Sequence, residues 1–368
     1  MRDEFKYLLA LSSVPGIGNA TLKALLTHFE LAEDICTATE KELLSVPGIN
    51  PKIVAEIIKA RETHNFDIQL KIDMPSHTEI IEYTNEKYPQ LLKTIYDPPP
   101  YLFARGNLDL LDELCFGVVG TRKATSYGLK MAQHISTGLA QAGFTIVSGM
   151  AEGVDAEAHR AALAVTGKTI AVLGCGVDIV YPSINQSLYK EIYKHGLIIS
   201  EFLPASEPTK YTFPKRNRII SGLSKGVLFV EGGKKSGAMI TVDYALEQGR
   251  DVFAIPGRID TDAAQGTNWL IQHGAKLVQN ANDISEEYGM VCDAHNVCSV
   301  NRVKAIIKNY QLDQESERIL EALAEGEQNI EILSRLLDMD IRSLQAKLTM
   351  LELKGIVKRV SGRVFGLA

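Results

Sequence analysis

The middle of the chain alternates short apolar runs with segments of helical periodicity. The runs are rich in Val and Ile, and between them hydrophobic residues recur every three or four positions. Continuous apolar runs separated by helices are typical of a parallel sheet that is covered on both faces. The runs span residues 116–119, 145–147, 169–173, 197–199, 226–230 and 251–255. The pattern predicts an α/β fold over residues 83–296, an extended Rossmann-like, doubly wound domain.

Residues 87–106, at the start of this region, contain three consecutive prolines, Pro98, Pro99 and Pro100. Proline fixes φ and ends helices, so the segment is extended. We expect it to be a linker that enters the α/β domain.

Two similar motifs open the chain, Val14-Pro15-Gly16-Ile17-Gly18 and Val46-Pro47-Gly48-Ile49-Asn50, each followed by a helical pattern. Gly, and Asn50 in the second motif, tolerate the left-handed backbone of a tight turn between helices. The repeat resembles the helix-hairpin-helix DNA-binding motif, in which free N–H groups at a helix start hold a phosphate. A small bundle that uses the turns only for packing fits equally well. We expect a helical, helix-hairpin-helix-like domain over residues 1–70.

After the α/β region the pattern changes to three helical segments, 317–324, 330–337 and 341–354, followed by two β-rich segments around the turn dipeptide Ser361-Gly362. This order predicts a winged-helix domain over residues 305–368. From residue 341 onward the only carboxylate is Glu352, and the cations are Arg342, Lys347, Lys354, Lys358, Arg359 and Arg363. Such a basic edge suits contact with DNA, although a protein-binding winged helix fits as well.

Composition indicates an ordinary globular protein of two or three domains. The chain has 368 residues, 45% hydrophobic and 23% charged, with no apolar run of membrane-spanning length and no signal-peptide layout at the N-terminus. We therefore expect a cytoplasmic protein that does not contact a membrane. Its five cysteines are scattered and odd in number, which indicates reduced thiols. Cys292-x2-His295-x2-Cys298 has ligand-like spacing but lacks a fourth ligand, so no metal site is predicted.

One short segment carries an unusual charge balance. Residues 213–225 contain four cations and no carboxylate, although the chain has a formal net charge of -6. We expect a loop that buries Ile219 and Ile220 and lets Arg216, Asn217 and Arg218 project together. Phe213, near Lys215, offers a stacking face for a base. The segment therefore predicts an anion-binding site.

Three turns that follow apolar runs predict the rest of this site. They are Gly120-Thr121-Arg122, Ser148-Gly149-Met150 and Lys235-Ser236-Gly237. At the strand ends of an α/β sheet, such turns can direct backbone N–H groups toward a phosphate. Arg122 suits bidentate phosphate recognition, and an ordinary surface arginine in a loop before a helix is the less favoured alternative. Neither a complete dinucleotide fingerprint nor a Walker motif is present, so no cofactor is predicted.

Asp155 and His159 lie four residues apart and hence on one helix face. The two residues suit an acid/base pair, but a structural contact between helix and sheet is the favoured interpretation.

Together these motifs resemble the DprA/Smf family, the DNA-processing protein A of bacteria. The resemblance covers roughly 200 residues and rests on motifs that occur in the family's order: Gly120-Thr-Arg122 with Tyr127-Gly128, Ser148-Gly-Met-Ala-Glu-Gly-Val-Asp155 with His159, Ala171-Val-Leu-Gly174 with Tyr181-Pro182, Ser200-Glu201, Phe213-Pro-Lys-Arg-Asn-Arg-Ile-Ile220, Ser236-Gly237, and Pro256-Gly257 leading to Gly266-Thr-Asn268. It implies a homodimeric single-stranded DNA-binding protein of competence and DNA recombination. Such a protein protects strands and helps to load RecA recombinase during natural transformation.

The resemblance also implies a DNA-binding pocket. By motif, the pocket maps onto Gly120, Thr121, Arg122, Gly149, Met150, Phe213, Lys215, Arg216, Asn217, Arg218, Ser236 and Gly237. The chain departs from the family at Met150, where Gly or Leu is frequent, and at Glu152, where an Arg is frequent. Loss of that cation weakens one expected phosphate contact.

The alternative is a nucleotide-binding enzyme similar to the phosphoribohydrolases. Glu201, Glu231, Asp155 and His159 would then supply acids and bases. Those enzymes display a Pro-Gly-Gly-x-Gly-Thr loop, which the segment 230–235 matches poorly. We therefore interpret the chain as a non-catalytic mediator.

Overall fold

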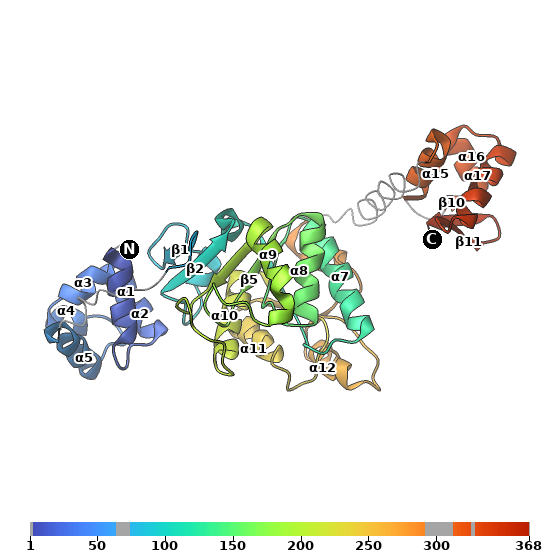
Figure 1. The fold of residues 1–368 in the computed structure, drawn as a ribbon. Coiled ribbons are helices and arrows are strands. Elements are labelled where there is room, and N and C mark those ends of the chain that lie inside the picture. Colours follow the sequence, from blue (N-terminus) through green and yellow to red (C-terminus); the bar gives the residue numbers. More distant parts are fainter. Residues whose placement is uncertain (1–2, 64–73, 291–311, 325–327, 368) are drawn as a thin grey trace. The chain divides into compact units, whose positions relative to one another are not determined.

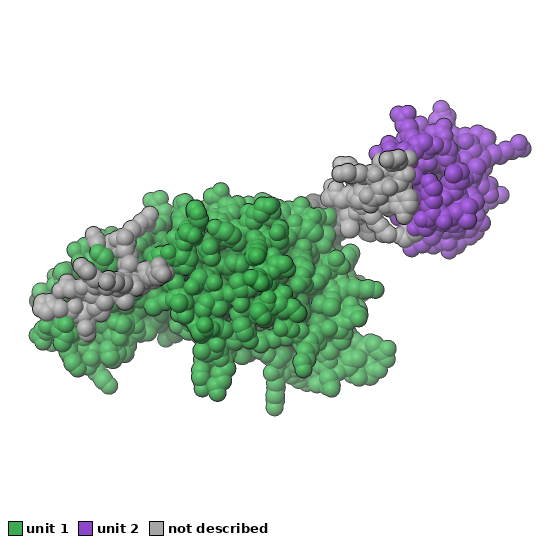
Figure 2. Space-filling model, viewed as in Figure 1, with its two compact units in different colours: residues 1–290 green, residues 291–368 purple. Residues whose placement is uncertain are grey.

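The computed structural model describes residues 3–63, 74–290, 312–324 and 328–367. The chain forms two compact units, residues 1–290 and residues 291–368 (Figure 2). Among the described residues, no helix is both long and apolar enough to span a bilayer. The predicted division into three domains stays a prediction.

The first unit is built on a nine-stranded sheet of order β1-β2-β6-β5-β4-β3-β7-β8-β9. Figure 1 labels β1, β2 and β5 of this sheet. The strands are β1 (Glu79–Glu82), β2 (Tyr101–Gly106), β3 (Cys115–Val119), β4 (Thr145–Ser148), β5 (Thr169–Val172), β6 (Leu197–Ser200), β7 (Gly226–Phe229), β8 (Asp251–Ala254) and β9 (Lys276–Leu277). The part from β6 to β9 is parallel, while β2 is antiparallel to both β6 and β1. The prediction of a doubly wound parallel sheet is confirmed for this central part.

Helices connect the parallel strands. They are α7 (Ser126–Gln141), α8 (Val154–Val165), α9 (Gln186–His195), α10 (Thr212–Leu223), α11 (Met239–Glu247) and α12 (Gln265–Gln272). All residues of β3 to β7 are buried, which explains their continuous apolar character. The chain runs from β3 outward to β6, then returns through α10 to β7 on the other side of β3. The strand order therefore reverses at β3, where ligands of such sheets bind.

The linker predicted over residues 87–106 is wrong. This segment contains helix α6 (Gln90–Lys93) and strand β2, which pairs with β6 in the main sheet. The three prolines lead directly into strand β2, whose Phe103 is fully buried. Strand β1 also belongs to this sheet, although it precedes the predicted domain start at residue 83.

The N-terminal region consists of α1 (Asp3–Ser13), α2 (Asn19–Phe29), α3 (Ala32–Thr37), α4 (Glu40–Leu44) and α5 (Pro51–Glu62). Gly16 and Gly48 take left-handed backbone, with φ of 86° and 84°. We also expected left-handed backbone at Asn50, and this prediction is wrong because the φ of Asn50 is -109°. Its Oδ1 instead accepts a hydrogen bond from the Ile53 N–H and caps α5, which occupies one donor that a phosphate would use.

The second unit is a small helical fold with a three-stranded sheet. Its elements are α15 (Gln314–Ala324), β10 (Gln328–Asn329), α16 (Ile330–Leu337), α17 (Ile341–Leu353), β11 (Val357–Ser361) and β12 (Val364–Leu367). Leu333, Leu348 and Phe365 lie in its separate apolar core. The winged-helix prediction is confirmed, and β10 is an additional strand that pairs with β12.

The sequence predicted reduced cysteines and no metal site. Cys36, Cys115 and Cys175 are buried and free, in agreement with reduced thiols. The Cys292, His295 and Cys298 set lies outside the described residues. Within the described residues, no cluster of three or more His, Cys, Asp or Glu side chains could hold a metal ion.

Candidate anion-binding site

The cation-rich segment 213–225 is mostly a helix, α10, and the prediction of a loop is wrong. Pro214 lies in its first turn, where the missing N–H costs little. Ile219 and Ile220 are buried, as expected. Successive helical residues are about 100° apart, so Arg216 and Arg218 point about 200° apart. They therefore cannot project together.

A cavity of ≈ 430 Å³, here named the basic pocket, lies at the end of β3 and is also lined by α10 and the start of α11. Eight predicted site residues line it: Gly120, Thr121, Arg122, Phe213, Arg216, Asn217, Ser236 and Gly237. Gly149 lines a smaller adjoining cavity together with Arg122, Phe213 and Arg216. Met150, Lys215 and Arg218 line neither cavity. The sheet therefore brings the three predicted turns together but not all of the predicted side chains.

The backbone donors of these turns are less available than expected. The N–H of Thr121 donates to the Glu231 carbonyl at 2.8 Å, and that of Ser236 donates to the Gly233 carbonyl at 3.0 Å. The Gly149 N–H donates to Oδ2 of Asp155 at 3.2 Å. These three N–H groups hold the turns in shape. These three donors are therefore not free for an anion, whereas the cations Arg122, Lys123 and Arg216 line the pocket.

Arg216 is the cation at the back of the basic pocket and is only 4% exposed. Its Nη1 donates to the Gly149 carbonyl at 2.7 Å and also to the Val172 carbonyl. A Cβ on Gly149 would lie 2.5 Å from Nη2, so only glycine lets the guanidinium approach this strand end. Nη2 has no hydrogen-bond partner among the described residues and is left to a ligand.

The charge of Arg216 is only partly compensated. The pKa of Arg216 is lowered to about 10, mainly because burial removes hydration from the charged form and also because Arg122 lies nearby. Asp155, which also lines the pocket, opposes this effect. A second negative charge in the cavity would stabilise the guanidinium and hence bind there favourably.

Arg122 and Phe213 form the mouth of the pocket. The Arg122 guanidinium lies 5.1 Å from the centroid of the Phe213 ring, within cation–π range. The Tyr181 ring lies 5.4 Å from the same centroid at an interplanar angle of 30°. The ring that we expected to stack on a base is thus already in contact with Arg122 and Tyr181.

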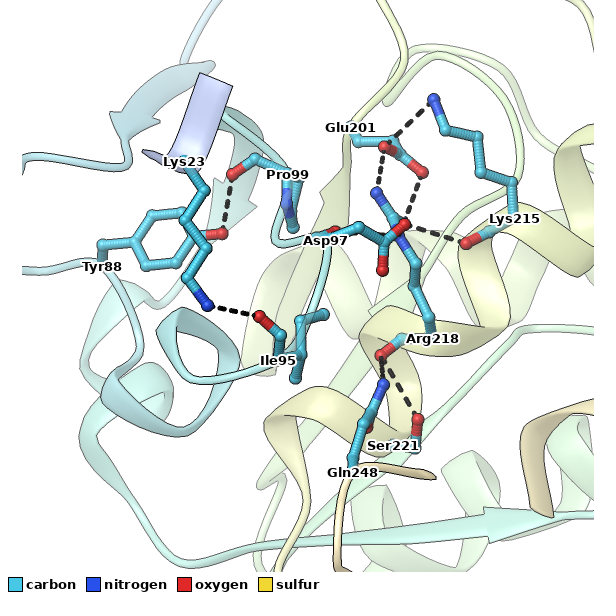
Figure 3. Close-up of polar contacts among 10 residues, drawn as sticks. All are labelled: Lys23, Tyr88, Ile95, Asp97, Pro99, Glu201, Lys215, Arg218, Ser221 and Gln248. Atoms are coloured by element: carbon cyan, nitrogen blue, oxygen red, sulfur yellow. Dashed lines mark hydrogen bonds and ion pairs between the residues drawn. The ribbon is translucent and has the colours of Figure 1, made fainter. Parts of the chain in front are cut away.

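Arg218 is part of an ion-pair network on another side of α10 (Figure 3). Its Nη1 and Nη2 donate to the two Glu201 oxygens at 2.8 and 2.7 Å, and its Nε donates to Oδ2 of Asp97 at 2.9 Å. Burial by itself lowers the pKa of Arg218, but Glu201 and Asp97 outweigh it and the pKa is raised. The expectation that Arg218 projects as a free cation is wrong, because its side chain is 1% exposed and fully paired.

The same network joins α10 to the segment before β2. Lys215 Nζ lies 3.4 Å from Oε2 of Glu201, and its side chain is about half exposed. Lys23 of α2 donates to the Ile95 carbonyl at 2.7 Å, two residues from Asp97 (Figure 3). These contacts fix the helix that carries Arg216.

Met150 and Glu152 mark the departures from the family pattern. Met150 is fully buried and takes left-handed backbone, with φ of 61°, which is uncommon for a residue with a side chain. Its carbonyl accepts a hydrogen bond from Nδ2 of Asn185 at 2.9 Å. Glu152 lines the smaller cavity beside Arg122, so it places a carboxylate next to the cations.

The four candidate acids and bases are all engaged within the protein. His159 Nδ1 lies 2.7 Å from Thr169 Oγ1, and burial lowers the pKa of His159 to about 3. Asp155 accepts from Gly149 and not from His159. Glu231 accepts from Thr125 N and Oγ1 at 2.7 and 2.6 Å, and Glu201 pairs with Arg218. These contacts agree with the structural interpretation of the Asp155 and His159 pair.

Sequence reasoning missed two charged residues of the basic pocket. Lys123 lines the pocket beside Arg122, and its place directly after the turn motif was the available signal. Asp155 lines it from the start of α8, which no charge count of a contiguous segment can reveal.

Three family models match the chain. The model for DNA recombination-mediator protein A matches residues 79–289, that for a SAM-like helix-hairpin-helix tandem matches residues 8–63, and that for the DprA winged-helix domain matches residues 308–363.

Curated proteins and solved structures agree with these matches. The chain is 41% identical to the Smf protein of Synechocystis over 293 residues, 78% of this chain and 74% of that protein. It is 46% identical to DprA of Bacillus subtilis over 208 residues, 56% of this chain and 70% of that protein. The crystal structure of Streptococcus pneumoniae DprA superposes with a TM-score of 0.64 at 36% identity, over 77% of this chain and 97% of that one. Helicobacter pylori DprA, whose structure concerns its single-stranded DNA binding mode, gives a TM-score of 0.53 at 33% identity, over 58% of this chain and 98% of that one.

Proposed function

Since the chain belongs to the DNA recombination-mediator protein A family, we propose that it is a non-catalytic mediator that binds single-stranded DNA in the basic pocket. The observation that carries this proposal is Arg216, a buried cation with a free Nη2 in a cavity at the switch point of the sheet. An anionic ligand completes its environment. The phosphates of a DNA strand supply such charges at regular intervals.

The shape of the site favours a single strand. Arg122, Lys123 and Arg216 converge on one cavity instead of forming a long basic face. A flexible strand can bend its phosphates into a cavity, whereas a duplex needs an extended positive surface. The single-stranded DNA binding described for the Helicobacter pylori relative supports the same choice.

The contact residues are part of the proposal. The predicted residues that line the two cavities provide the direct contacts: Gly120, Thr121, Arg122, Gly149, Phe213, Arg216, Asn217, Ser236 and Gly237. Lys215, which is about half exposed, adds a peripheral charge. Arg218 and Met150 act by positioning α10 and the turn after β4, since both side chains are buried away from the cavity.

We further propose that the protein protects strands and helps to load RecA recombinase during natural transformation, in the cytoplasm and as a homodimer. This proposal rests on the family, whose members are named for DNA processing and recombination. The helical region over 1–70 and the winged helix over 305–368 are then accessory to the α/β domain over 83–296. Polar groups of both regions are already engaged within the protein, which supports this accessory role. Asn50 caps α5, and Lys347 and Arg363 are ion-paired with Asp313 and Glu331.

Enzymatic function is less well supported. A general acid or base must reach a substrate proton. Asp155, His159, Glu201 and Glu231 instead bond to protein groups. The family is that of a recombination mediator.

The test is a fluorescence anisotropy titration of a labelled thirty-nucleotide strand and of the matching duplex, at several salt concentrations. We expect tighter binding of the single strand, and log affinity that falls with log salt by about 0.7 for each phosphate neutralised. Equal affinity for the duplex, or a flat salt response, would contradict the proposal. Incubation with a nucleoside monophosphate is the parallel assay, in which release of free base would favour the enzyme.

A further inference from the structure

A second cavity, of ≈ 480 Å³, lies after the carboxyl ends of β7 and β8. Its lining is mostly hydrophobic and includes Tyr127, Val230, Ile255, Pro256 and Ala264. We name it the apolar pocket. The DNA contacts proposed above do not use it.

The hydroxyl groups around the apolar pocket are already satisfied. The Tyr127 hydroxyl donates to the Pro256 carbonyl at 2.8 Å. Thr261 Oγ1 donates to the Arg258 carbonyl at 2.9 Å, and Thr267 Oγ1 donates to the Ala264 carbonyl at 3.1 Å. A ligand therefore meets mainly hydrocarbon surface and one aromatic ring. A flat apolar group suits such a cavity better than a strongly hydrated one.

The apolar pocket lacks the excess of cations that lines the basic pocket. The carboxylate of Glu231 lies in its wall, and Arg258, the cation at its rim, is paired with Asp260 at 2.6 Å. The other described residues of its lining carry no charge. The described lining of the apolar pocket therefore offers a phosphate no unpaired cation, whereas Arg122, Lys123 and Arg216 favour a phosphate in the basic pocket.

The two pockets adjoin because they share one wall. Residues 120–123 line the basic pocket, and Thr125 and Tyr127 of the same stretch line the apolar pocket. Glu231 ties this stretch to the end of β7, since its carbonyl accepts from Thr121 N–H and its Oε2 accepts from Thr125 N–H, at 2.8 and 2.7 Å. A ligand with an anionic part and an adjacent apolar part would match the pair.

We propose that the apolar pocket takes a nucleobase of the strand whose phosphates occupy the basic pocket. A nucleotide has the required two parts, and one strand can place a phosphate on one side of the shared wall and a base on the other. The inference rests on the proposed function. In this arrangement the apolar pocket contacts the face of a base, whereas the contacts in the basic pocket reach only the phosphates.

The test compares two strands of equal length, one of twenty thymidines and one of twenty abasic nucleotides, so that only the bases differ. Wild-type protein is expected to bind the thymidine strand about tenfold more tightly, the usual effect of one stacked base. In Thr261→Trp the indole covers the rim of the apolar pocket. This variant should lose most of that difference and keep its affinity for the abasic strand.

Asp262→Trp is the matched control, because Asp262 is exposed, adjoins Thr261 and does not line the pocket. It should retain the tenfold difference. An equal effect of both substitutions, or no effect of Thr261→Trp in a variant with wild-type melting behaviour, would overturn the apolar pocket as a base site. Wild-type protein that binds neither strand at low salt would instead overturn the proposed function.

Competition with free thymidine tests whether the base in the apolar pocket belongs to the bound strand. Competition by millimolar thymidine with the thymidine strand, but not with the abasic strand, supports the shared site. Thymidine binding that Thr261→Trp abolishes without changing strand affinity would overturn the strand as the source.

Discussion

The two arginines of helix α10 share a sequence neighbourhood but have opposite environments. Arg216 lies in the basic pocket, bonded to backbone carbonyls and left with a free Nη2 among the described residues. Arg218, two residues on, is held by Glu201 in a two-pronged ion pair and by Asp97. One arginine is available to a ligand, and the other stabilises the helix that presents it.

The difference shows that a cluster of cations in sequence does not define a binding surface. On a helix, residues two apart point in nearly opposite directions, so one charged segment divides into two regions of different use. Arg218 needs both carboxylates because a buried unpaired charge is very unfavourable. Arg216 tolerates weaker compensation beside Asp155, at the cost of a lowered pKa.

The largest predicted effect concerns Arg218, on the side of α10 that forms ion pairs with Glu201 and Asp97. Arg218→Met should destabilise the protein by about 3–5 kcal/mol, because the buried Glu201 then keeps only the half-exposed Lys215 as a partner. Urea denaturation measures this loss. Adding Glu201→Leu should restore most of the stability, because the buried charge is then removed. A stable Arg218→Met protein that has lost strand binding would show that Arg218 contacts the ligand directly.

The next largest effect concerns Arg216, on the side of α10 that lines the basic pocket. Arg216→Met should weaken single-strand binding by about 1.5–3 kcal/mol, the usual contribution of a hydrogen bond to a charged group. The loss should be alike for all sequences, and the salt slope should fall by about 0.7. Lys215→Met is the control, because this cation lies on the same helix but lines neither cavity. If both variants lose the same affinity, binding depends on net charge and not on the pocket.

Much of this fold follows from the sequence, because the burial of β3 to β7 on both faces requires uninterrupted apolar runs. Strands β1 and β2 were not predicted because their pairing with β6 is a long-range contact that no local pattern records. The three turns were found because a parallel sheet places its strand ends along one edge. The roles of Arg216 and Arg218 could not be separated, since Glu201 and Asp97 come from distant segments.

The free energy of unfolding should depend on pH through His159, a buried residue of α8 whose pKa is affected by Arg216 of α10. Burial, together with the nearby Arg216 and Arg160, lowers the pKa of His159 from 6.5 to about 3. Above pH 6.5 both folded and unfolded chains carry a neutral His159, so its contribution to stability is constant. As the pH falls below 6.5, only the unfolded chain binds the proton, and stability falls by about 1.4 kcal/mol per pH unit until about pH 3.

His159→Asn should remove this dependence. Between pH 7.5 and 5.5 the free energy of unfolding of the wild type should fall by about 1.4 kcal/mol more than that of the variant. Urea denaturation at the two pH values provides the comparison. Equal losses in both proteins would mean that His159 is protonated in the folded state.

The smallest effect is expected on the winged helix, where the sequence shows a cation excess similar to that of α10. Arg363 is paired with Glu331 at 2.6 Å, and Arg359 lies over the Phe365 ring. Lys358 is exposed on β11, where solvent screens its charge. Changing Lys358, Arg359 and Arg363 together to Glu should therefore alter single-strand affinity less than about threefold, far below the effect of Arg216→Met. Anisotropy titration at fixed salt measures both, and a tenfold loss in the triple variant would make the wing a second DNA contact and end the distinction between the two regions.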